Sequence, residues 1–111
     1  MKNIVTGGAG FIGSHLIDWL MKSGEEVICV DNLCTGDRKN IDKWDDHPKF
    51  KFIEHDIIHP INIQAEKIWH LACPASSNNY KKDAIKTSLT NSIGTYNMLE
   101  LATKNKAKIL L

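Results

Sequence analysis

The sequence has few cysteines, no long hydrophobic run and no excess of charge of either sign. Its three cysteines, Cys29, Cys34 and Cys73, are odd in number and never form a Cys-x-x-Cys pair. This argues against both a disulfide framework and a zinc knuckle, so we expect three free thiols.

No apolar run approaches the roughly 20 residues that a membrane-spanning helix needs. Fourteen basic and 13 acidic residues give a net charge of +1, and the two signs are interspersed. Neither a nucleic-acid surface nor an anionic membrane surface is indicated. The chain starts directly in an apolar segment, without a basic leader or a signal core. We therefore expect a cytoplasmic protein whose partners are small molecules.

Three residues with metal-binding side chains, His55, Asp56 and His59, lie close together in the sequence. The two histidines would meet on one face of a helix. However, the preceding residues have strand character and Pro60 follows at once. We expect a solvated loop here and no metal site.

The composition, with 42% hydrophobic and 24% charged residues, is typical of one small globular domain. Hydrophobic patterning predicts strands at Met1–Thr6, Glu26–Asp31, Phe50–Glu54, Lys67–Ala72 and Ala107–Leu111, and helices from Ile12 to about Ser23 and from Thr87 to Lys104. The polar stretch Asn32–Pro48 is predicted to be a long loop with one short helical turn near residues 41–44. This alternation predicts the α/β class: a Rossmann-like, doubly wound parallel sheet of about five strands in a three-layer αβα arrangement.

A glycine-rich turn follows the first predicted strand and opens the first helix. Gly8 to Gly13 match G-x-G-x-x-G, and Asp31 ends the second strand. Gly10 would let a pyrophosphate approach the backbone, and Gly13 would let the helix pack closely on its strands. The N–H groups of the first helical turn would face the anion. The pattern therefore predicts a dinucleotide-binding site.

The residue at the end of the second strand bears on the choice of dinucleotide. The Asp31 carboxylate would accept hydrogen bonds from the adenosine ribose hydroxyls and would repel a 2′-phosphate, which favours NAD over NADP. Arg38 and Lys39 lie just beyond this strand and leave NADP open as an alternative.

Four segments together resemble the extended short-chain dehydrogenase/reductase family, the NAD-dependent epimerases and dehydratases, and within it most closely the UDP-glucuronate decarboxylases. These segments are Val5–Leu16, Val30–Gly36, His55–Ile57 and His70–Ser76. The resemblance extends over essentially the whole chain. It implies one NAD-binding domain, residues 1–111, that ends within its fifth strand and lacks the substrate domain.

The resemblance also implies roles by position, running from the pyrophosphate through the ribose and adenine to the nicotinamide. The implied NAD-binding residues are Gly7, Gly10, Phe11, Ile12, Gly13, Asp31, Asn32, Leu33, Thr35, Gly36, Asp56, Ile57, Leu71, Ala72, Cys73 and Thr90. Asn97 is the implied contact to the nucleotide-sugar substrate, UDP-glucuronate. Alternative interpretations remain: Leu71 and Ala72 as strand core, Cys73 as a buried thiol, and Asp56 as a loop carboxylate.

The implied chemistry is redox-neutral: NAD oxidises the sugar 4-hydroxyl, carbon dioxide leaves, and the hydride returns to give UDP-xylose. The family's base is the tyrosine of Tyr-x-x-x-Lys. Here Tyr80 is followed four residues later by Ala84, and Tyr96 by Glu100. No catalytic residue is therefore assigned, and we expect the 111-residue chain to be inactive alone.

One position departs from the decarboxylase pattern and keeps related functions open. Leu89 stands where the decarboxylases carry a lysine for the sugar nucleotide. A dTDP-glucose 4,6-dehydratase fragment, a UDP-sugar 4-epimerase fragment and a non-catalytic dinucleotide-binding module remain alternatives. The resemblance further implies that the full-length enzyme is a homodimer.

Overall fold

The computed structural model describes residues 1–72 and 84–111. In these residues five parallel strands form one sheet: β1 (Lys2–Thr6), β2 (Glu26–Asp31), β3 (Phe50–Glu54), β4 (Lys67–His70) and β5 (Lys108–Leu110). Helix α1 (Phe11–Lys22) joins β1 to β2, and 3₁₀ turns η1 (Arg38–Asn40) and η2 (Asp42–Trp44) lie before β3. Before β5 come α3 (Ala84–Leu89), the π-helical segment η3 (Thr90–Gly94) and α4 (Thr95–Asn105).

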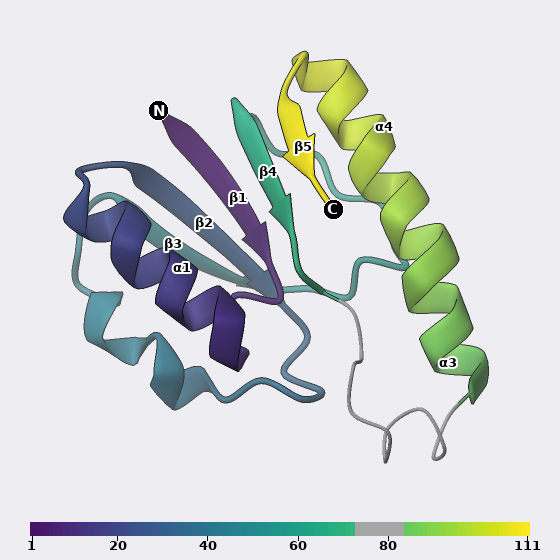
Figure 1. Cartoon of the computed structure of the whole chain (residues 1–111), viewed down its shortest axis with the longest axis horizontal. Coiled ribbons are helices and arrows are strands. Elements are labelled where there is room, and N and C mark those ends of the chain that lie inside the picture. The colour runs from purple at the N-terminus through teal and green to yellow at the C-terminus, as the bar shows by residue number, and fades with distance from the viewer. Residues whose placement is uncertain (73–83) are drawn as a thin grey trace.

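The strand order is β3-β2-β1-β4-β5, with β1 in the centre (Figure 1). The chain moves outward from β1 through β2 to β3, and then returns to the other side of β1 to form β4 and β5. This confirms the predicted Rossmann-like, doubly wound sheet. It also places a topological switch point between β1 and β4, where sheets of this kind bind ligands at the carboxyl ends of their strands.

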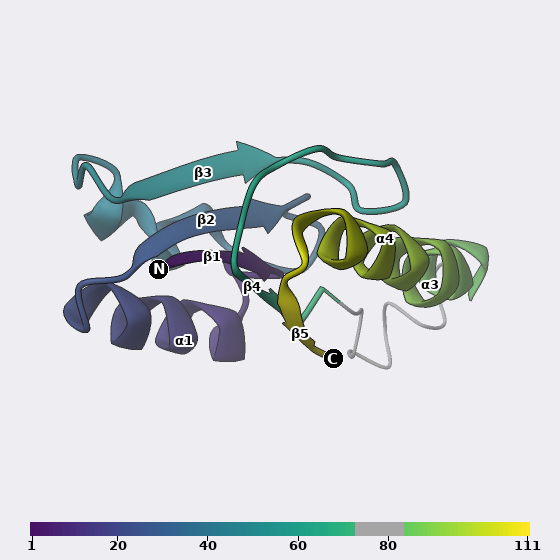
Figure 2. The ribbon, with the colours of Figure 1, turned by 90° about the horizontal axis from the view of Figure 1, so that it is seen from above.

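The sheet has a hydrophobic core on each face because successive strand residues point to opposite sides. Val5 and Cys29 face the core under α1, which contains Val5, Ala9, Ile17, Leu20, Met21, Val27, Cys29, Ile41 and Phe50. Ile4 and Ile28 face the core under α4, which contains Ile4, Ile28, Val30, Ile57, Ala65, Ile68, Met98, Leu101 and Ala102. Figure 2 shows α1 and α4 on opposite sides of the twisted sheet, which gives the three predicted layers.

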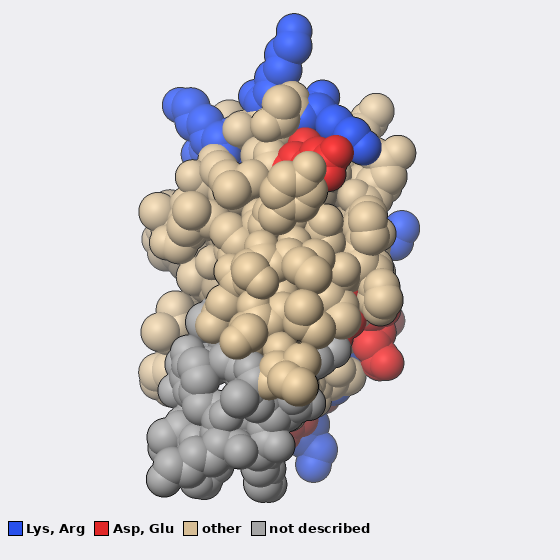
Figure 3. All heavy atoms as spheres, turned by 90° about the vertical axis from the view of Figure 1, so that its right-hand side faces the viewer, with Lys and Arg blue, Asp and Glu red and all other residues tan. Residues whose placement is uncertain are grey.

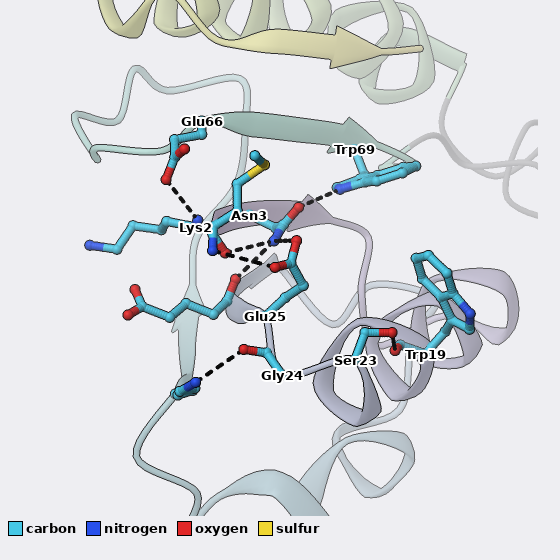
Figure 4. A network of polar contacts seen from close by, with 11 residues as sticks. Lys2, Asn3, Trp19, Ser23, Gly24, Glu25, Glu66 and Trp69 are labelled. Atoms are coloured by element: carbon cyan, nitrogen blue, oxygen red, sulfur yellow. Dashed lines mark hydrogen bonds and ion pairs between the residues drawn. The ribbon is translucent and has the colours of Figure 1, made fainter.

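A polar network fixes the central strands at their amino-terminal ends (Figure 4). The fully buried side chain of Asn3 accepts a hydrogen bond from the Trp69 indole at 3.0 Å. Its amide nitrogen donates to the carbonyls of Met1 and Glu26, each at 3.1 Å. Strands β1, β2 and β4 are thereby held together at the end of the sheet opposite to the glycine turn.

Two element boundaries differ from the sequence prediction by more than one residue. Strand β4 ends at His70 rather than Ala72, because the Ala72 N–H donates to the Thr6 side chain instead of continuing the ladder. The helix predicted from Thr87 is already helical at Ala84 and contains the π-helical segment Thr90–Gly94. Hydrophobic periodicity does not reveal an extra residue in one helical turn.

Candidate dinucleotide-binding site

A pocket of about 330 Å³ lies where the carboxyl ends of β1, β2 and β4 meet the first turn of α1. Figure 1 shows these strands pointing the same way, toward the beginning of α1. The pocket is lined by Gly7, Gly10, Phe11, Ile12, Gly13, Val30, Asp31, Asn32, Cys34, Thr35, His55, Asp56, Ile57, Leu71, Ala72 and Thr90. Most of the residues predicted from the sequence are therefore brought together, while their contacts to a ligand remain predictions.

The glycines of the turn differ in how strictly the surrounding structure excludes a side chain. Gly7 has a φ of 70°, and a Cβ there would lie 2.8 Å from the Leu71 carbonyl group. A Cβ on Gly13 would lie 2.3 Å from the Gly7 oxygen, so α1 could not pack as closely on the turn. At Gly10, among the described residues, a Cβ would meet only the Gly7 oxygen, at 3.3 Å. The fold itself therefore needs Gly7 and Gly13 more than it needs Gly10.

The amino terminus of α1 offers hydrogen-bond donors to the pocket. Gly10 is the N-cap residue, and the first turn carries no acidic side chain. The first N–H groups of a helix have no partner within the helix, and the helix dipole favours an anion there. Phe11 and Ile12 are 78% and 70% exposed, and both line the pocket. This geometry suits a phosphate group.

Asp31 is 7% exposed, and both of its carboxylate oxygens accept backbone hydrogen bonds. Oδ2 accepts from the Ala9 N–H at 2.9 Å, and Oδ1 accepts from the Leu33 N–H at 2.7 Å. A carboxylate oxygen can accept a second hydrogen bond, so capacity remains for ribose hydroxyls. Leu33, with a φ of 60°, orients this turn through its backbone and is not among the described lining residues.

The loop after β2 is attached to the glycine turn through Ala9. The Ala9 carbonyl accepts hydrogen bonds from the Asp37 N–H at 3.0 Å and from the Asn40 side chain at 2.8 Å. A Cβ on Gly36 would lie 2.8 Å from the Ala9 backbone. Gly36 therefore packs closely on Ala9 and is not among the described lining residues, and its contact to the ribose stays a prediction.

Polar side chains border the pocket beyond β2 and β3. The Asn32 amide donates to the Asp56 carboxylate at 3.3 Å, and the other oxygen of Asp56 accepts from the Ile58 N–H. Ile57 is 3% exposed and also lines the pocket. This places Asp56 beside Asn32 in the pocket lining, and the contacts of Asp56 and Ile57 to adenine stay predictions.

The lining contains three residues that the sequence prediction did not include: Val30, Cys34 and His55. Each lies next to a predicted residue or within a segment that carries the resemblance, and this proximity is the signal that could have identified them. His55 donates from Nε2 to the His59 carbonyl at 2.8 Å, in a loop as predicted. Among residues 1–72 and 84–111 no group of three His, Cys, Asp or Glu is placed to hold a metal ion.

On the β4 side, the lining is formed by Leu71, Ala72 and Thr90. Thr90 is 6% exposed and is the first residue of the π-helical segment. Leu71 also packs against the core under α1, so the core interpretation and the pocket interpretation both describe it. Cys73 lies outside the described residues.

Two polar side chains are engaged away from the pocket. The Asn97 amide is buried and donates to the Ile57 carbonyl at 2.8 Å, so Asn97 supports the pocket wall, and its substrate contact stays a prediction. The Arg38 guanidinium lies over the Phe52 ring, 4.4 Å from its centre, and forms an ion pair with Asp45. Arg38 is therefore held by other groups rather than free beside Asp31, which favours NAD over NADP.

None of the helices described has the length and hydrophobicity to span a bilayer. The family model for GDP-mannose 4,6 dehydratase matches residues 4–110. The chain is 53% identical to UDP-glucuronic acid decarboxylase 6 of Arabidopsis thaliana, covering all of this chain and 33% of that protein. It is 51% identical to UDP-glucuronic acid decarboxylase 1 of Danio rerio, covering 97% of this chain and 26% of that protein.

Among solved structures, dTDP-glucose 4,6-dehydratase (DesIV) from Streptomyces venezuelae with NAD and TYD bound superposes with a TM-score of 0.87 at 30% identity. This match covers 98% of the chain and 38% of the dehydratase. The chain thus spans about a third of the length of the relatives it matches. By sequence and by fold, the chain belongs to the GDP-mannose 4,6-dehydratase family of extended short-chain dehydrogenases/reductases.

Proposed function

We propose that this chain is the NAD-binding portion of a UDP-glucuronate decarboxylase. The observation that carries the proposal is the position of Asp31 beside the amino terminus of α1, in one pocket. A dinucleotide needs a hydrogen-bond acceptor for its ribose and a helix amino terminus for its phosphates, and this pocket has both.

Different residues of the chain would bind different parts of the dinucleotide. Backbone N–H groups at Phe11, Ile12 and Gly13 would hold the pyrophosphate, and Asp31 would hold the adenosine ribose. Asn32, Thr35, Asp56 and Ile57 would border the adenosine, with Leu71, Ala72 and Thr90 toward the nicotinamide. Bound NAD would accept a hydride from the sugar carbon that carries the 4-hydroxyl, and the reduced cofactor would later return it.

The decarboxylase assignment rests on sequence similarity to the two decarboxylases named above, which extends over essentially the whole chain. The dehydratase of known structure, which shares the fold, is only 30% identical. Leu89 departs from the decarboxylase pattern and lies before Thr90, close to the pocket. A 4,6-dehydratase or a 4-epimerase is therefore the alternative to the decarboxylase assignment.

The cofactor part of the proposal is tested by titrating the 111-residue chain with NAD in a calorimeter. The Gly10→Val variant, whose side chain would fill the place of the pyrophosphate, should lose NAD binding while its circular dichroism spectrum stays unchanged. A folded wild-type chain that binds no NAD would overturn the proposal. Equal affinity in wild type and variant would show that the glycine turn is only structural.

The substrate part is tested in a chimera in which this chain replaces the matching segment of a UDP-glucuronic acid decarboxylase. We expect release of carbon dioxide and formation of UDP-xylose from UDP-glucuronate. The same chimera carrying Asp31→Ala is the control, and it should be much slower at a fixed NAD concentration. A correctly folded chimera that leaves UDP-glucuronate unchanged but acts on dTDP-glucose or UDP-glucose would refute the decarboxylase assignment.

We also propose that the longer protein assembles as a homodimer through the outer face of α3 and α4. Figure 3 shows a broad uncharged area there, with acidic and basic side chains at its upper end. Ile85 of α3, Ile93 of η3, and Tyr96 and Leu99 of α4 are exposed, with exposed fractions of 75%, 43%, 63% and 41%. Exposed apolar patches of this kind mark contact surfaces. Analytical ultracentrifugation of the chimera, with and without Tyr96→Glu, tests this assignment.

A further inference from the structure

Three side chains form a chain of hydrogen bonds that joins β1, β4 and α4. The Thr6 hydroxyl lies 2.8 Å from His70 Nδ1, and His70 Nε2 lies 3.1 Å from the Thr95 hydroxyl. None of these three is among the described residues that line the pocket. The mechanism proposed above gives them no role.

The direction of each hydrogen bond follows from counting donors and acceptors. The Thr6 hydroxyl oxygen accepts from the N–H of Leu71 at 3.0 Å and from the N–H of Ala72 at 3.1 Å. These two bonds occupy both of its lone pairs, so its single hydrogen must point to His70 Nδ1. Nδ1 therefore carries no proton, and Nε2–H donates to Thr95. His70 is fixed as the neutral Nε2–H tautomer.

The surroundings agree with a neutral ring. Thr6 is fully buried, and His70 is partly buried between the sheet and α4. Burial lowers the pKa of His70 below its ordinary value of 6.5. A protonated ring would bring a third donor to a hydroxyl oxygen that can accept only two hydrogen bonds.

The two amides that Thr6 holds belong to residues that line the pocket on the opposite side of β1 from Asp31. The same backbone lies directly against the glycine turn, because a Cβ on Gly7 would be 2.8 Å from the Leu71 carbonyl group. Thr95, at the other end of the hydrogen-bond chain, follows immediately after the π-helical segment that begins with Thr90. A shift of the Leu71–Ala72 backbone would therefore act first on the β4 side of the pocket, whereas the Asp31 side is held separately by the hydrogen bonds from the Ala9 and Leu33 N–H groups to Asp31.

We propose that Thr6 and His70 are positioning residues, which set the Leu71–Ala72 backbone and tie it to the helical segment carrying Thr90. This inference rests on the proposed function, since it assigns the β4 side of the pocket to the non-adenosine half of the dinucleotide. Losing the Thr6 hydroxyl leaves the Ala72 N–H without its partner. The Leu71–Ala72 backbone would then no longer be fixed on the side of the pocket that takes the non-adenosine half of the dinucleotide. The adenosine half, held by Asp31 and α1, should not change.

The experiment compares two ligands that share the adenosine half: NAD and ADP. Thr6→Val keeps the volume of the side chain and removes the hydroxyl, whereas Thr6→Ser keeps the hydroxyl. We expect Thr6→Val to bind NAD about five- to tenfold more weakly, in line with the loss of one or two hydrogen bonds, while its affinity for ADP is unchanged. Thr6→Ser should restore NAD affinity.

A spectroscopic measurement tests the tautomer directly and needs no ligand. Long-range ¹H–¹⁵N correlation spectra of the imidazole should show the Nε2–H pattern for His70 in wild type and in Thr6→Ser. If Thr6→Val fails to fold, His70→Asn and His70→Phe take its place, since asparagine keeps an acceptor toward Thr6 and phenylalanine does not. His70→Asn should then bind NAD more tightly than His70→Phe.

The outcomes separate the two proposals. A wild-type chain that binds neither NAD nor ADP overturns the proposed function, and the positioning role falls with it. A wild-type chain that binds both, with a variant that loses affinity for both equally or for neither, overturns only the positioning role. An Nδ1–H pattern for His70 also overturns the positioning role.

Discussion

The Asp31 carboxylate and the Ala9 backbone N–H lie 2.9 Å apart, so the residue assigned to the ribose also closes the glycine turn. The Ala9 carbonyl in turn holds the loop that follows Asp31. Phosphate cradle and ribose acceptor are therefore one connected unit. A change at either part should be felt at the other.

Replacing Asp31 with alanine should weaken NAD binding by about 1.5–3 kcal/mol, as expected for hydrogen bonds to a charged group. It should also reduce the preference for NAD over NADP, because the charge that repels a 2′-phosphate is gone. Calorimetric titration with both dinucleotides measures the two effects. Asp37→Ala is the matched control, since Asp37 is an exposed carboxylate that, among the described residues, accepts its side-chain hydrogen bond from the Lys39 N–H within its own turn. Tighter binding of NADP than NAD by the wild type would contradict the role of Asp31.

Alanine at Gly10 and alanine at Gly13 should have different effects. In a helix, replacing glycine with alanine ordinarily stabilises by up to about 1 kcal/mol. At Gly13 the new Cβ would lie 2.3 Å from the Gly7 oxygen, and such overpacking costs about 1–3 kcal/mol, so the melting temperature should fall. Gly10→Ala should melt like the wild type and bind NAD more weakly. Thermal melts followed by circular dichroism, beside titrations, check both. A stable Gly13→Ala variant would contradict the packing argument.

The stability of the chain should depend on pH through His70. Burial lowers the folded-state pKa of His70 below 6.5, so the unfolded chain binds more protons between the two values. The contribution of neutral His70 to the free energy of unfolding is fully present above about pH 6.5 and is lost as the pH falls toward the folded-state pKa. The free energy of unfolding should change there by at most about 1.4 kcal/mol per pH unit. Urea denaturation of wild type and His70→Asn between pH 5 and 8 isolates this slope as the difference between the two profiles. Parallel profiles would count against it.

The 111-residue chain alone should turn over no nucleotide sugar, even with saturating NAD. Neither Tyr80 nor Tyr96 has a lysine four residues later, and general-base catalysis is typically worth a factor of about 10² to 10⁴. The assay is release of labelled carbon dioxide from UDP-glucuronate, with the chimera as positive control. Measurable turnover by the isolated chain would contradict this prediction.

Much of the fold could be predicted because the strands are short, apolar and separated by clear turn signals. Strands β2 and β3 have the predicted bounds, Glu26–Asp31 and Phe50–Glu54. The end of β4 could not be predicted, since it depends on a hydroxyl from β1 that is distant in sequence. The π-helical segment left no trace in the hydrophobic pattern either.

The parts of the candidate site that depend on a local sequence pattern could be predicted. The parts that depend on contacts between distant segments could not. The glycine turn and Asp31 follow from local spacing alone. Gly36 and Leu33 could be associated with the site by sequence, but the close packing of Gly36 on Ala9 and the left-handed backbone of Leu33 appear only in three dimensions. The same holds for Asn97, whose amide is bonded to a carbonyl that is 40 residues earlier in the sequence.

The central position of β1 in the sheet has a consequence for how the chain folds. Lys2 of β1 pairs with Glu26 of β2, a close neighbour along the chain, whereas Asn3 pairs with Lys67 of β4 across a much longer loop. Closing the longer loop costs more entropy and slows folding. The β1–α1–β2 unit is therefore expected to form early, with its phosphate cradle and ribose acceptor. The β4 side of the pocket would be added in a later step, so the rate at which a refolding chain gains full NAD affinity should report the docking of its second half.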